Sequence, residues 1–270
     1  YHPTQDESTG AEIGFGGDSI RALKHAPYLI LESQAQAFKS WTPYPGQLTL
    51  DLFSHLASGA CGILSWNWHS IHNAIESYWK GILSHDLMPH ETYKELKEFR
   101  EELLPIEAKL KNLQKHSEIG ILADNASLTG LDEFPISESL NYNLILRWFF
   151  DCCHELNLEC DILYKEDSFD QYKLLIIPAL YSASDEVLLK IKEYVKRGGH
   201  ILVSFKSAFA DDELKIYSDA QPHILTECIG ATYDMFTIPK EVMLKLQNDS
   251  EDAVSISTQT VSNPQTDSVK

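Results

Sequence analysis

Glu32 is the residue whose type and position best suit chemistry. It follows Tyr28-Leu29-Ile30-Leu31, a run of four apolar residues typical of a strand buried on both faces. A carboxylate there lies where a buried strand meets solvent, and charged residues are seldom buried without a partner or a task. From spacing alone, a capping or salt-bridged acid explains Glu32 as well as a functional acid does. The surrounding residues must therefore decide its role.

Aromatic and polar side chains gather in the loops that follow this strand and the next. Four of the five tryptophans fall there, together with two tyrosines and several polar residues: Trp41, Trp66, Trp68, Trp79, Tyr44, Tyr78, Asn67, His69, His72 and Glu76. Aromatic faces with polar edges suit sugar rings, whose C–H faces stack while their hydroxyl groups need hydrogen-bond partners. Core packing explains any one tryptophan, but it explains the whole set less well.

Other polar residues have ordinary explanations beside the functional ones. Glu76 lies in Ile75-Glu76-Ser77-Tyr78-Trp79, where an acid at a helix start commonly serves as a cap or dipole partner. His85 and Asp86 could form a catalytic pair, although a loop histidine is more often only solvated. Asp18 and Arg21 could form a local ion pair of little energetic consequence.

The elements that would position these residues follow a strand, loop and helix repeat. Residues 1–27 have the glycine-rich composition of a loop, 47–59 have helical spacing, 61–66 form a second apolar run, and 91–115 predict a long amphipathic helix. This repeat is typical of parallel α/β architecture, in which a (β/α)8 barrel places catalysis at the carboxyl ends of its strands. Two units cannot close a barrel of about 250 residues, so most of it would lie upstream of Tyr1.

The pattern restarts after a junction at His116-Ser117. Strands are predicted at 119–123, 160–163, 174–178 and 200–205, with helices at 140–156 and 186–196 and a glycine stop at Gly198-Gly199. We expect a doubly wound, flavodoxin-like domain, and hence two domains, 1–116 and 117–270. Cys152-Cys153 lies inside a predicted helix, which disfavours a nucleophilic cysteine, and no Gly-x-Gly-x-x-Gly follows a strand.

Charge and cysteine content exclude several classes of function. The 270 residues contain 40 acidic and 22 basic side chains, a net charge of -18 that repels phosphate backbones. The five cysteines show neither a disulfide framework nor a Cys-x-x-Cys pair, so we expect reduced thiols and no metal. No apolar run or leader suggests a membrane partner. The start at Tyr1 and the polar end at 255–270 suggest a chain cut at both ends.

Taken together, the motifs resemble one known family. The ordered set is Leu31-Glu32-Ser33-Gln34, Trp41, Pro45-Gly46, Gly59-Ala60, Ser65-Trp66-Asn67-Trp68-His69, Glu76-Ser77-Tyr78-Trp79 and Leu83-Ser84-His85-Asp86. It resembles the seventh and eighth strands of the catalytic TIM barrel in glycoside hydrolase family 42 β-galactosidases. The motifs at 118–122, 172–179 and 194–199 resemble that family's trimerisation domain, a module similar to class I glutamine amidotransferases without their catalytic residues. The resemblance covers roughly residues 1 to 240.

The resemblance implies a role for each matching residue. Glu32 matches the nucleophile, Trp41 the tryptophan that walls the galactose subsite, and Glu76 the acid that binds galactose hydroxyls. Trp66 belongs to the same aromatic mouth. Trp79 stands where many members have a sugar-binding histidine, so His85 is a possible substitute. The acid/base, an Asn-Glu glutamate after strand four, and the family's cysteine zinc site would both lie upstream of Tyr1.

The implied activity is hydrolysis of β-galactosides by double displacement, without a cofactor, in a cytoplasmic homotrimer. Glu32 would attack the anomeric carbon and would have to stay ionised, while the missing glutamic acid protonates the leaving oxygen. We expect this chain alone to be inactive. Two alternatives stay open: a non-catalytic α/β oligomerisation or binding module, and, less favoured, an amidotransferase-like enzyme that acts through a cysteine.

Overall fold

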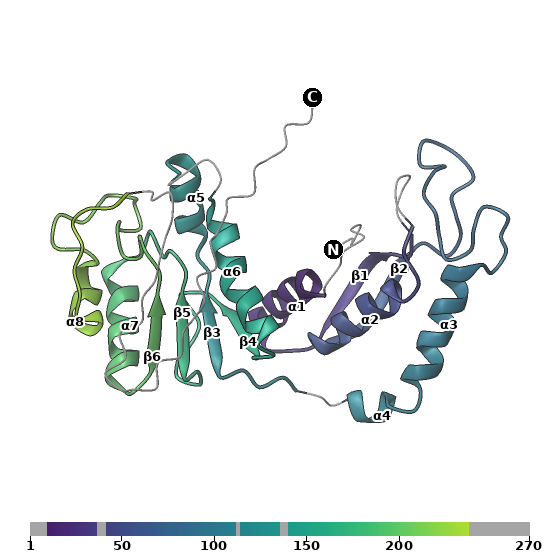
Figure 1. The fold of residues 1–270 in the computed structure, drawn as a ribbon, viewed down its shortest axis with the longest axis horizontal. Helices are drawn as coiled ribbons and strands as arrows, with labels where there is room; N and C mark the ends of the chain where they lie inside the picture. Colours follow the sequence, from purple (N-terminus) through teal and green to yellow (C-terminus); the bar gives the residue numbers. More distant parts are fainter. Residues whose placement is uncertain (1–9, 37–41, 112–113, 136–139, 238–270) are drawn as a thin grey trace, which may run out of the picture.

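The computed structural model describes residues 10–36, 42–111, 114–135 and 140–237, which form two α/β units (Figure 1). The first unit contains α1 (Ala11–Lys24), β1 (Tyr28–Gln34), α2 (Gln47–Ala57), β2 (Ala60–Trp66), α3 (Glu91–Leu103) and α4 (Glu107–Leu110). Strands β1 and β2 pair in parallel from Tyr28 opposite Ala60 to Gln34 opposite Trp66, with an irregularity between Ile30 and Ser33. Two strand and helix repeats therefore follow one another, as predicted.

The apolar side chains of these strands are more exposed than the sequence predicts. Leu29 is 57% exposed and Leu31 74% exposed, so the prediction of a strand buried on both faces is wrong for the described chain. The physical reason is that the sheet has only β1 and β2 among the described residues. A parallel strand is covered on both faces only when further strands and helices complete its layers.

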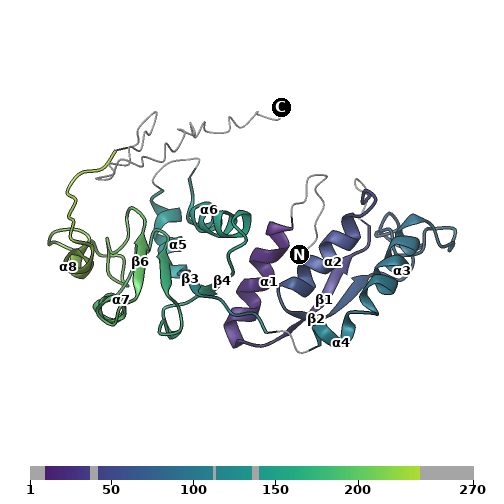
Figure 2. The same cartoon turned by 60° about the horizontal axis from the view of Figure 1, so that its bottom comes forward.

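Helix α1 replaces the loop that the glycine-rich composition predicts at residues 1–27. Its glycines permit close packing rather than a turn, because a Cβ on Gly17 would lie 2.3 Å from Tyr28 Oη and 2.6 Å from Ser58 Cβ. Phe15 of the same helix packs edge-on against Phe150 of the second unit, with ring centroids 5.2 Å apart. Helix α1 thus lies between β1 and the second unit (Figure 2).

The single helix predicted at 91–115 is two shorter helices. Helix α3 ends at Leu103, and α4 begins at Glu107 after a break that contains Pro105. Proline has no backbone N–H and its ring clashes with the preceding turn, so it interrupts a helix even where the apolar spacing continues.

The second unit is a doubly wound sheet in the strand order β4-β3-β5-β6. Its elements are β3 (Ile119–Leu122), α5 (Asn125–Glu133), α6 (Tyr142–Glu155), β4 (Cys160–Leu163), β5 (Leu174–Ile177), α7 (Asp185–Lys196), β6 (His200–Val203), the 3-10 turn η1 (His223–Leu225) and α8 (Thr226–Ile229). All three pairings are parallel, as in flavodoxin-like folds. Among the described helices, none combines the length and apolar content that a bilayer crossing requires.

Alternate residues of these strands form two separate cores. Ile121 and Ile176 pack with Phe150 of α6 on one face of the sheet, whereas Leu122 and Leu175 pack on the other. That second face is covered by α7, through Leu188, Ile191 and Tyr194. Successive side chains of a strand point to opposite faces, so a strand of four apolar residues needs helices on both sides.

Buried charges join the two units. Arg21 Nη2 lies 2.6 Å from Asp161 Oδ1 on β4 and 3.3 Å from Asp18 Oδ1. Lys115 Nζ donates to both oxygens of Asp18, at 2.8 and 2.9 Å. The predicted Asp18–Arg21 ion pair is present, but it is not only local, because both side chains are buried and share a network with Asp161. A buried charge left without its partner is strongly destabilising.

Candidate active site

Glu32 lies inside β1 rather than at its end. The strand continues to Gln34, whose Cα is paired with Trp66 at the last position of β2. Because parallel strands present their carboxyl ends at one edge, Glu32 and Trp66 occupy the same edge of the sheet. Glu32 is exposed and Trp66 is 41% exposed. The structure thus brings together at this edge two of the residues that the sequence singles out.

The backbone after β1 is tied to the loop after β2. Ala35 donates its N–H to the Trp66 carbonyl at 3.4 Å, and the buried Gln36 donates Nε2 to the Gly81 carbonyl at 2.9 Å. Gln36 is not among the residues that the sequence pattern singles out. Its only signal is an amide side chain two residues past a strand end, which is a common loop composition.

Residues 67–87 form a loop that folds back on itself. Ile82 and Leu83 donate their N–H groups to the carbonyls of Asn67 and Trp68, both at 2.9 Å. Gly81 permits this approach, because a Cβ there would lie 2.4 Å from the backbone carbon of His69. The loop is therefore an ordered structure packed at the carboxyl edge of the sheet.

This loop carries three of the predicted site residues. Glu76 is exposed and lies in a turn in which its carbonyl accepts the Trp79 N–H at 2.8 Å, not at the start of a helix. Trp79 is half-buried, and His85 is exposed with Nε2 2.8 Å from the Ser77 carbonyl. Trp41 lies outside the described residues. The arrangement gives an exposed carboxylate on the strand and aromatic and polar side chains on the adjoining loop.

His85 and Asp86 do not form the catalytic pair that their adjacency suggested. Asp86 instead accepts hydrogen bonds from His90 Nε2 at 2.7 Å and from the Met88 N–H at 3.0 Å. The hydrogen bond from His90, followed by that from Met88, lowers the pKa of Asp86 below its ordinary value. Asp86 therefore stabilises the turn that contains Met88 and His90. His85 bonds to the Ser77 carbonyl instead.

Two further polar groups of the first unit, Asp51 and His55, are buried. Burial, with smaller contributions from Glu12 and Glu95, raises the pKa of Asp51 to about 7, and burial lowers the pKa of His55 to about 4. Both lie on α2 at helical i, i+4 spacing. Their shifted pKa values follow from burial on this helix.

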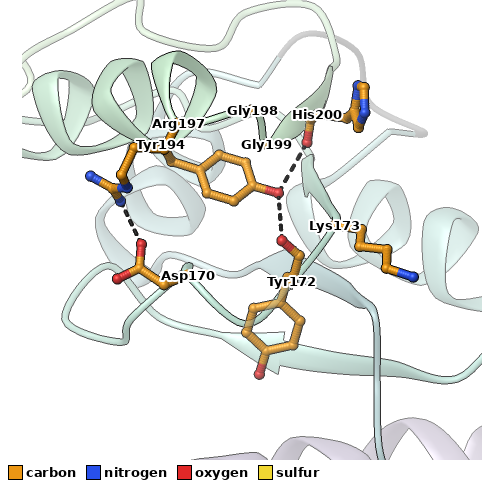
Figure 3. A pocket seen from close by; sticks show the side chains of 8 residues that line it. All are labelled: Asp170, Tyr172, Lys173, Tyr194, Arg197, Gly198, Gly199 and His200. Carbon is orange, nitrogen blue, oxygen red and sulfur yellow. Dashed lines mark hydrogen bonds and ion pairs between the residues drawn. The ribbon is translucent and has the colours of Figure 1, made fainter.

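A hollow of about 510 Å³ lies in the second unit (Figure 3). It sits where β5 and β6 begin, and Tyr194 Oη there donates to the carbonyls of Tyr172 and His200, at 3.0 and 3.4 Å. Ligands of open α/β sheets bind at the opposite, carboxyl ends of the strands. We therefore interpret this hollow as a packing feature at the end of α7, formed by the Tyr194 hydrogen bonds and the Gly198-Gly199 turn.

The described residues offer little other chemistry in the second unit. Cys152 is exposed and Cys153 buried, both inside α6 as predicted, and neither lies at a strand-to-helix turn. In the described part of the chain, no group of three or more His, Cys, Asp or Glu side chains could hold a metal ion.

Comparison with known proteins matches both units. A family model described as "Beta-galactosidase" matches residues 1–106, and one described as "Beta-galactosidase trimerisation domain" matches 117–268. The chain is 28% identical over 237 residues to the β-galactosidase LacZ of Heyndrickxia coagulans, covering 83% of this chain and 34% of that protein. It is 24% identical over 256 residues to the β-galactosidase BgaH of Haloferax lucentense, covering 92% and 38%. The chain thus spans about a third of the length of these relatives.

Solved structures agree on the fold. The β-galactosidase of the haloarchaeon Halorubrum lacusprofundi superposes with a TM-score of 0.77 at 21% identity, over 87% of this chain and 35% of that chain. The enzyme from Rahnella sp. R3 gives a TM-score of 0.78 at 18% identity, over 85% and 36%. The fold is therefore the predicted one, a C-terminal portion of a TIM barrel followed by an amidotransferase-like α/β domain, and the chain belongs to the glycoside hydrolase family 42 β-galactosidases.

Proposed function

We propose that Glu32 is the catalytic nucleophile of a retaining β-galactosidase. The observation that carries the proposal is the parallel register of β1 and β2, which pairs Gln34 with Trp66 and so leaves Glu32 two residues from the carboxyl edge that the loop 67–87 follows. In a (β/α)8 enzyme this carboxyl edge is where catalytic residues lie. Attack of a Glu32 oxygen on the anomeric carbon forms the galactosyl-enzyme, as the leaving oxygen departs with a proton from a second carboxyl group.

The second carboxyl group would come from residues outside this chain. Family members carry it in an Asn-Glu pair, and no Asn-Glu pair occurs among the 270 residues. In the second step the same group activates the water that releases galactose. With one carboxyl group of the two, this chain by itself is expected not to hydrolyse nitrophenyl β-galactoside.

The remaining site residues would bind the substrate. Glu76 would accept hydrogen bonds from galactose hydroxyls, Trp41 and Trp66 would offer apolar faces, and Trp79 with His85 would replace the histidine of other members. The exposed positions of Glu76 and His85 on one folded loop support this assignment. Sugar sites combine aromatic faces with a few placed polar groups.

Residues 117–270 would form the assembly domain, and residues 1–116 the end of the barrel. The boundary proposed at His116-Ser117 lies between α4 and β3, on the segment that joins the units in Figure 1. The match to a trimerisation domain supports a homotrimer. The charged network of Arg21 and Asp161 would then fix the site relative to that assembly.

The test uses an active enzyme that carries this chain. Glu32→Gln should reduce turnover of nitrophenyl β-galactoside by at least about 10⁴-fold, since covalent catalysis is lost while the fold is kept. Glu107→Gln, at an exposed glutamate paired with Arg100, is the matched control and should keep full activity. Undiminished turnover of the Glu32 variant would remove the residue from its role, and sedimentation of both variants checks that assembly is intact.

A further inference from the structure

Three histidines lie in a row on the loop after β2. The ring centroids of His69 and His72 are 5.7 Å apart, and those of His72 and His85 are 5.6 Å apart. All three side chains are exposed. The row therefore runs from the start of the loop to its end, with His72 in the middle.

Each ring has one nitrogen bound to a backbone carbonyl. His69 Nδ1 lies 2.8 Å from the Ser70 oxygen, His72 Nε2 lies 2.7 Å from the His85 oxygen, and His85 Nε2 lies 2.8 Å from the Ser77 oxygen. A carbonyl oxygen only accepts, so each of these nitrogens carries the hydrogen. A neutral imidazole has one N–H, so its other nitrogen is an acceptor. The row presents three acceptors: His69 Nε2, His72 Nδ1 and His85 Nδ1.

These acceptors favour hydroxyl donors over other ligands. A metal ion would also use imidazole lone pairs, but no cluster in the described part of the chain could hold one. An anion offers no hydrogen to an acceptor, and Glu76 on the same loop would repel it. A polyol carries several O–H donors spread over its length, which suits rings spaced by more than 5 Å.

Among polyols, the residues that flank the histidines favour a sugar as the ligand. Trp68 precedes His69 and is 59% exposed, and Tyr78 follows Ser77 and is 68% exposed. Exposed aromatic faces beside acceptors fit the C–H face and the hydroxyl edge of a sugar ring. His85 is bound to the Glu76 turn through the Ser77 carbonyl, and His69 lies two rings further along the row.

We propose that His72 and His69 bind hydroxyl groups of the leaving sugar of a disaccharide, next to a galactose held by Glu76 and His85. This inference rests on the proposed function. It means that the loop 67–87 determines whether a sugar or an apolar leaving group is preferred. One hydrogen bond to a hydroxyl contributes about 1 kcal/mol net, or about a fivefold change in affinity.

The test is binding to the 270-residue chain, so it is independent of turnover. Histidine Cε1–H signals are followed by NMR during titration with lactose and with methyl β-D-galactoside. Lactose should shift the His69 and His72 signals, and the methyl galactoside should leave these two unchanged. If lactose shifts His85 and the Trp79 indole but neither His69 nor His72, the inference is overturned while the galactoside site stands. If lactose shifts no signal, the inference is also overturned, and the Glu32 variant still decides the proposed function.

Two variants of His72 separate its role as a hydrogen-bond acceptor for the ligand from its structural hydrogen bond to the His85 carbonyl. Arginine at position 72 can still donate to the His85 carbonyl but has no acceptor, whereas glutamine has both groups. His72→Arg should weaken lactose binding about fivefold, and His72→Gln should stay within about twofold of the parent chain. His90→Phe, which removes a loop histidine bound to Asp86, is the control and should not change lactose binding. Equal affinities of the two His72 variants would overturn the proposal.

Discussion

The charge of His223, in the second unit, should make the stability of the fold depend on pH. Its Nδ1 lies 2.7 Å from Asp219 Oδ2 and its Nε2 lies 3.1 Å from Asp185 Oδ1, while the ring stacks on Tyr217 at 3.7 Å. Carboxylates only accept, so the two hydrogen bonds form together when both ring nitrogens carry a hydrogen and the ring is a cation. Burial alone would lower the pKa of His223, but the hydrogen bonds to Asp219 and Asp185 outweigh it and raise the pKa.

Because folding raises its pKa, His223 should stabilise the fold more at low pH than at high pH. The contribution is full below the unfolded-state pKa of about 6.5 and is lost as pH rises through the higher folded-state pKa. We expect His223→Gln to lower the free energy of unfolding by about 1 kcal/mol at pH 5.5, and by less at pH 9. Urea titrations at both pH values measure it, with the exposed His200→Gln as a control. An equal loss at both pH values would contradict the charged-ring interpretation.

The residue types identify candidates for the site better than they identify contacts. That Glu32 lies near the carboxyl end of a strand could be predicted from the apolar run before it, but the sequence pattern ends this strand too early, because β1 continues to Gln34. The pairing of His85 with the Ser77 carbonyl could not, because it depends on how the loop folds back around Gly81. The roles of Glu32, Glu76 and Trp79 are predictions that follow from the family resemblance.

At the scale of elements, Gly16 and Gly17 of α1 allow a matched comparison of two alanine substitutions. A Cβ at Gly17 would overlap Tyr28 and Ser58, whereas a Cβ at Gly16 would meet nothing within 4 Å. We expect Gly17→Ala to destabilise the chain by about 1–3 kcal/mol through overpacking. Gly16→Ala should stabilise it by about 0.5–1 kcal/mol, because alanine favours the helix. Thermal unfolding of the two variants compares them directly, and a stabilising Gly17→Ala would show that α1 does not pack closely on β1.

The same contrast explains which elements could be predicted. Strands β3 to β6 are short, mostly apolar runs bounded by turns, and β4 is predicted at its observed bounds of Cys160–Leu163. Helix α1 was missed because its glycines serve packing, which composition does not reveal. Helix α5 was missed because it is short, although Asp124 caps it by accepting the Ser127 N–H at 2.7 Å. Signals that depend on contacts far apart in sequence are absent from local patterns.

At the scale of the whole molecule, one buried charge network links the barrel portion to the second unit. Asp161 accepts hydrogen bonds from Arg21, from Ser117 Oγ at 2.8 Å and from Tyr172 Oη at 2.9 Å. Burial would raise the pKa of Asp161, but the hydrogen bond and charge of Arg21 outweigh it and lower the pKa. Arg21 on α1 therefore holds β4 through a carboxylate that stays charged.

Removing this arginine should weaken the attachment of the two units. Arg21→Met leaves Asp161 buried without its main partner, and we expect a loss of about 3 kcal/mol in the free energy of unfolding. Cleavage of the segment 104–118 by a protease should become faster, because that segment and α1 connect the same two units. Arg100→Met, at an exposed ion pair with Glu107, is the control and should change stability by less than about 0.5 kcal/mol.

A double variant decides whether charge or shape couples the units. Arg21→Met with Asp161→Leu removes both charges and replaces them with apolar groups, which often restores the stability lost with one partner. If charge pairing alone is at stake, the double variant should regain most of the lost free energy of unfolding and slow the proteolysis again. If the double variant is as unstable as Arg21→Met, then Arg21 acts through its geometry, including its hydrogen bond to the Ser58 carbonyl at 3.2 Å. In that case the orientation of α1, and with it the position of β1 and Glu32, depends on the guanidinium group itself.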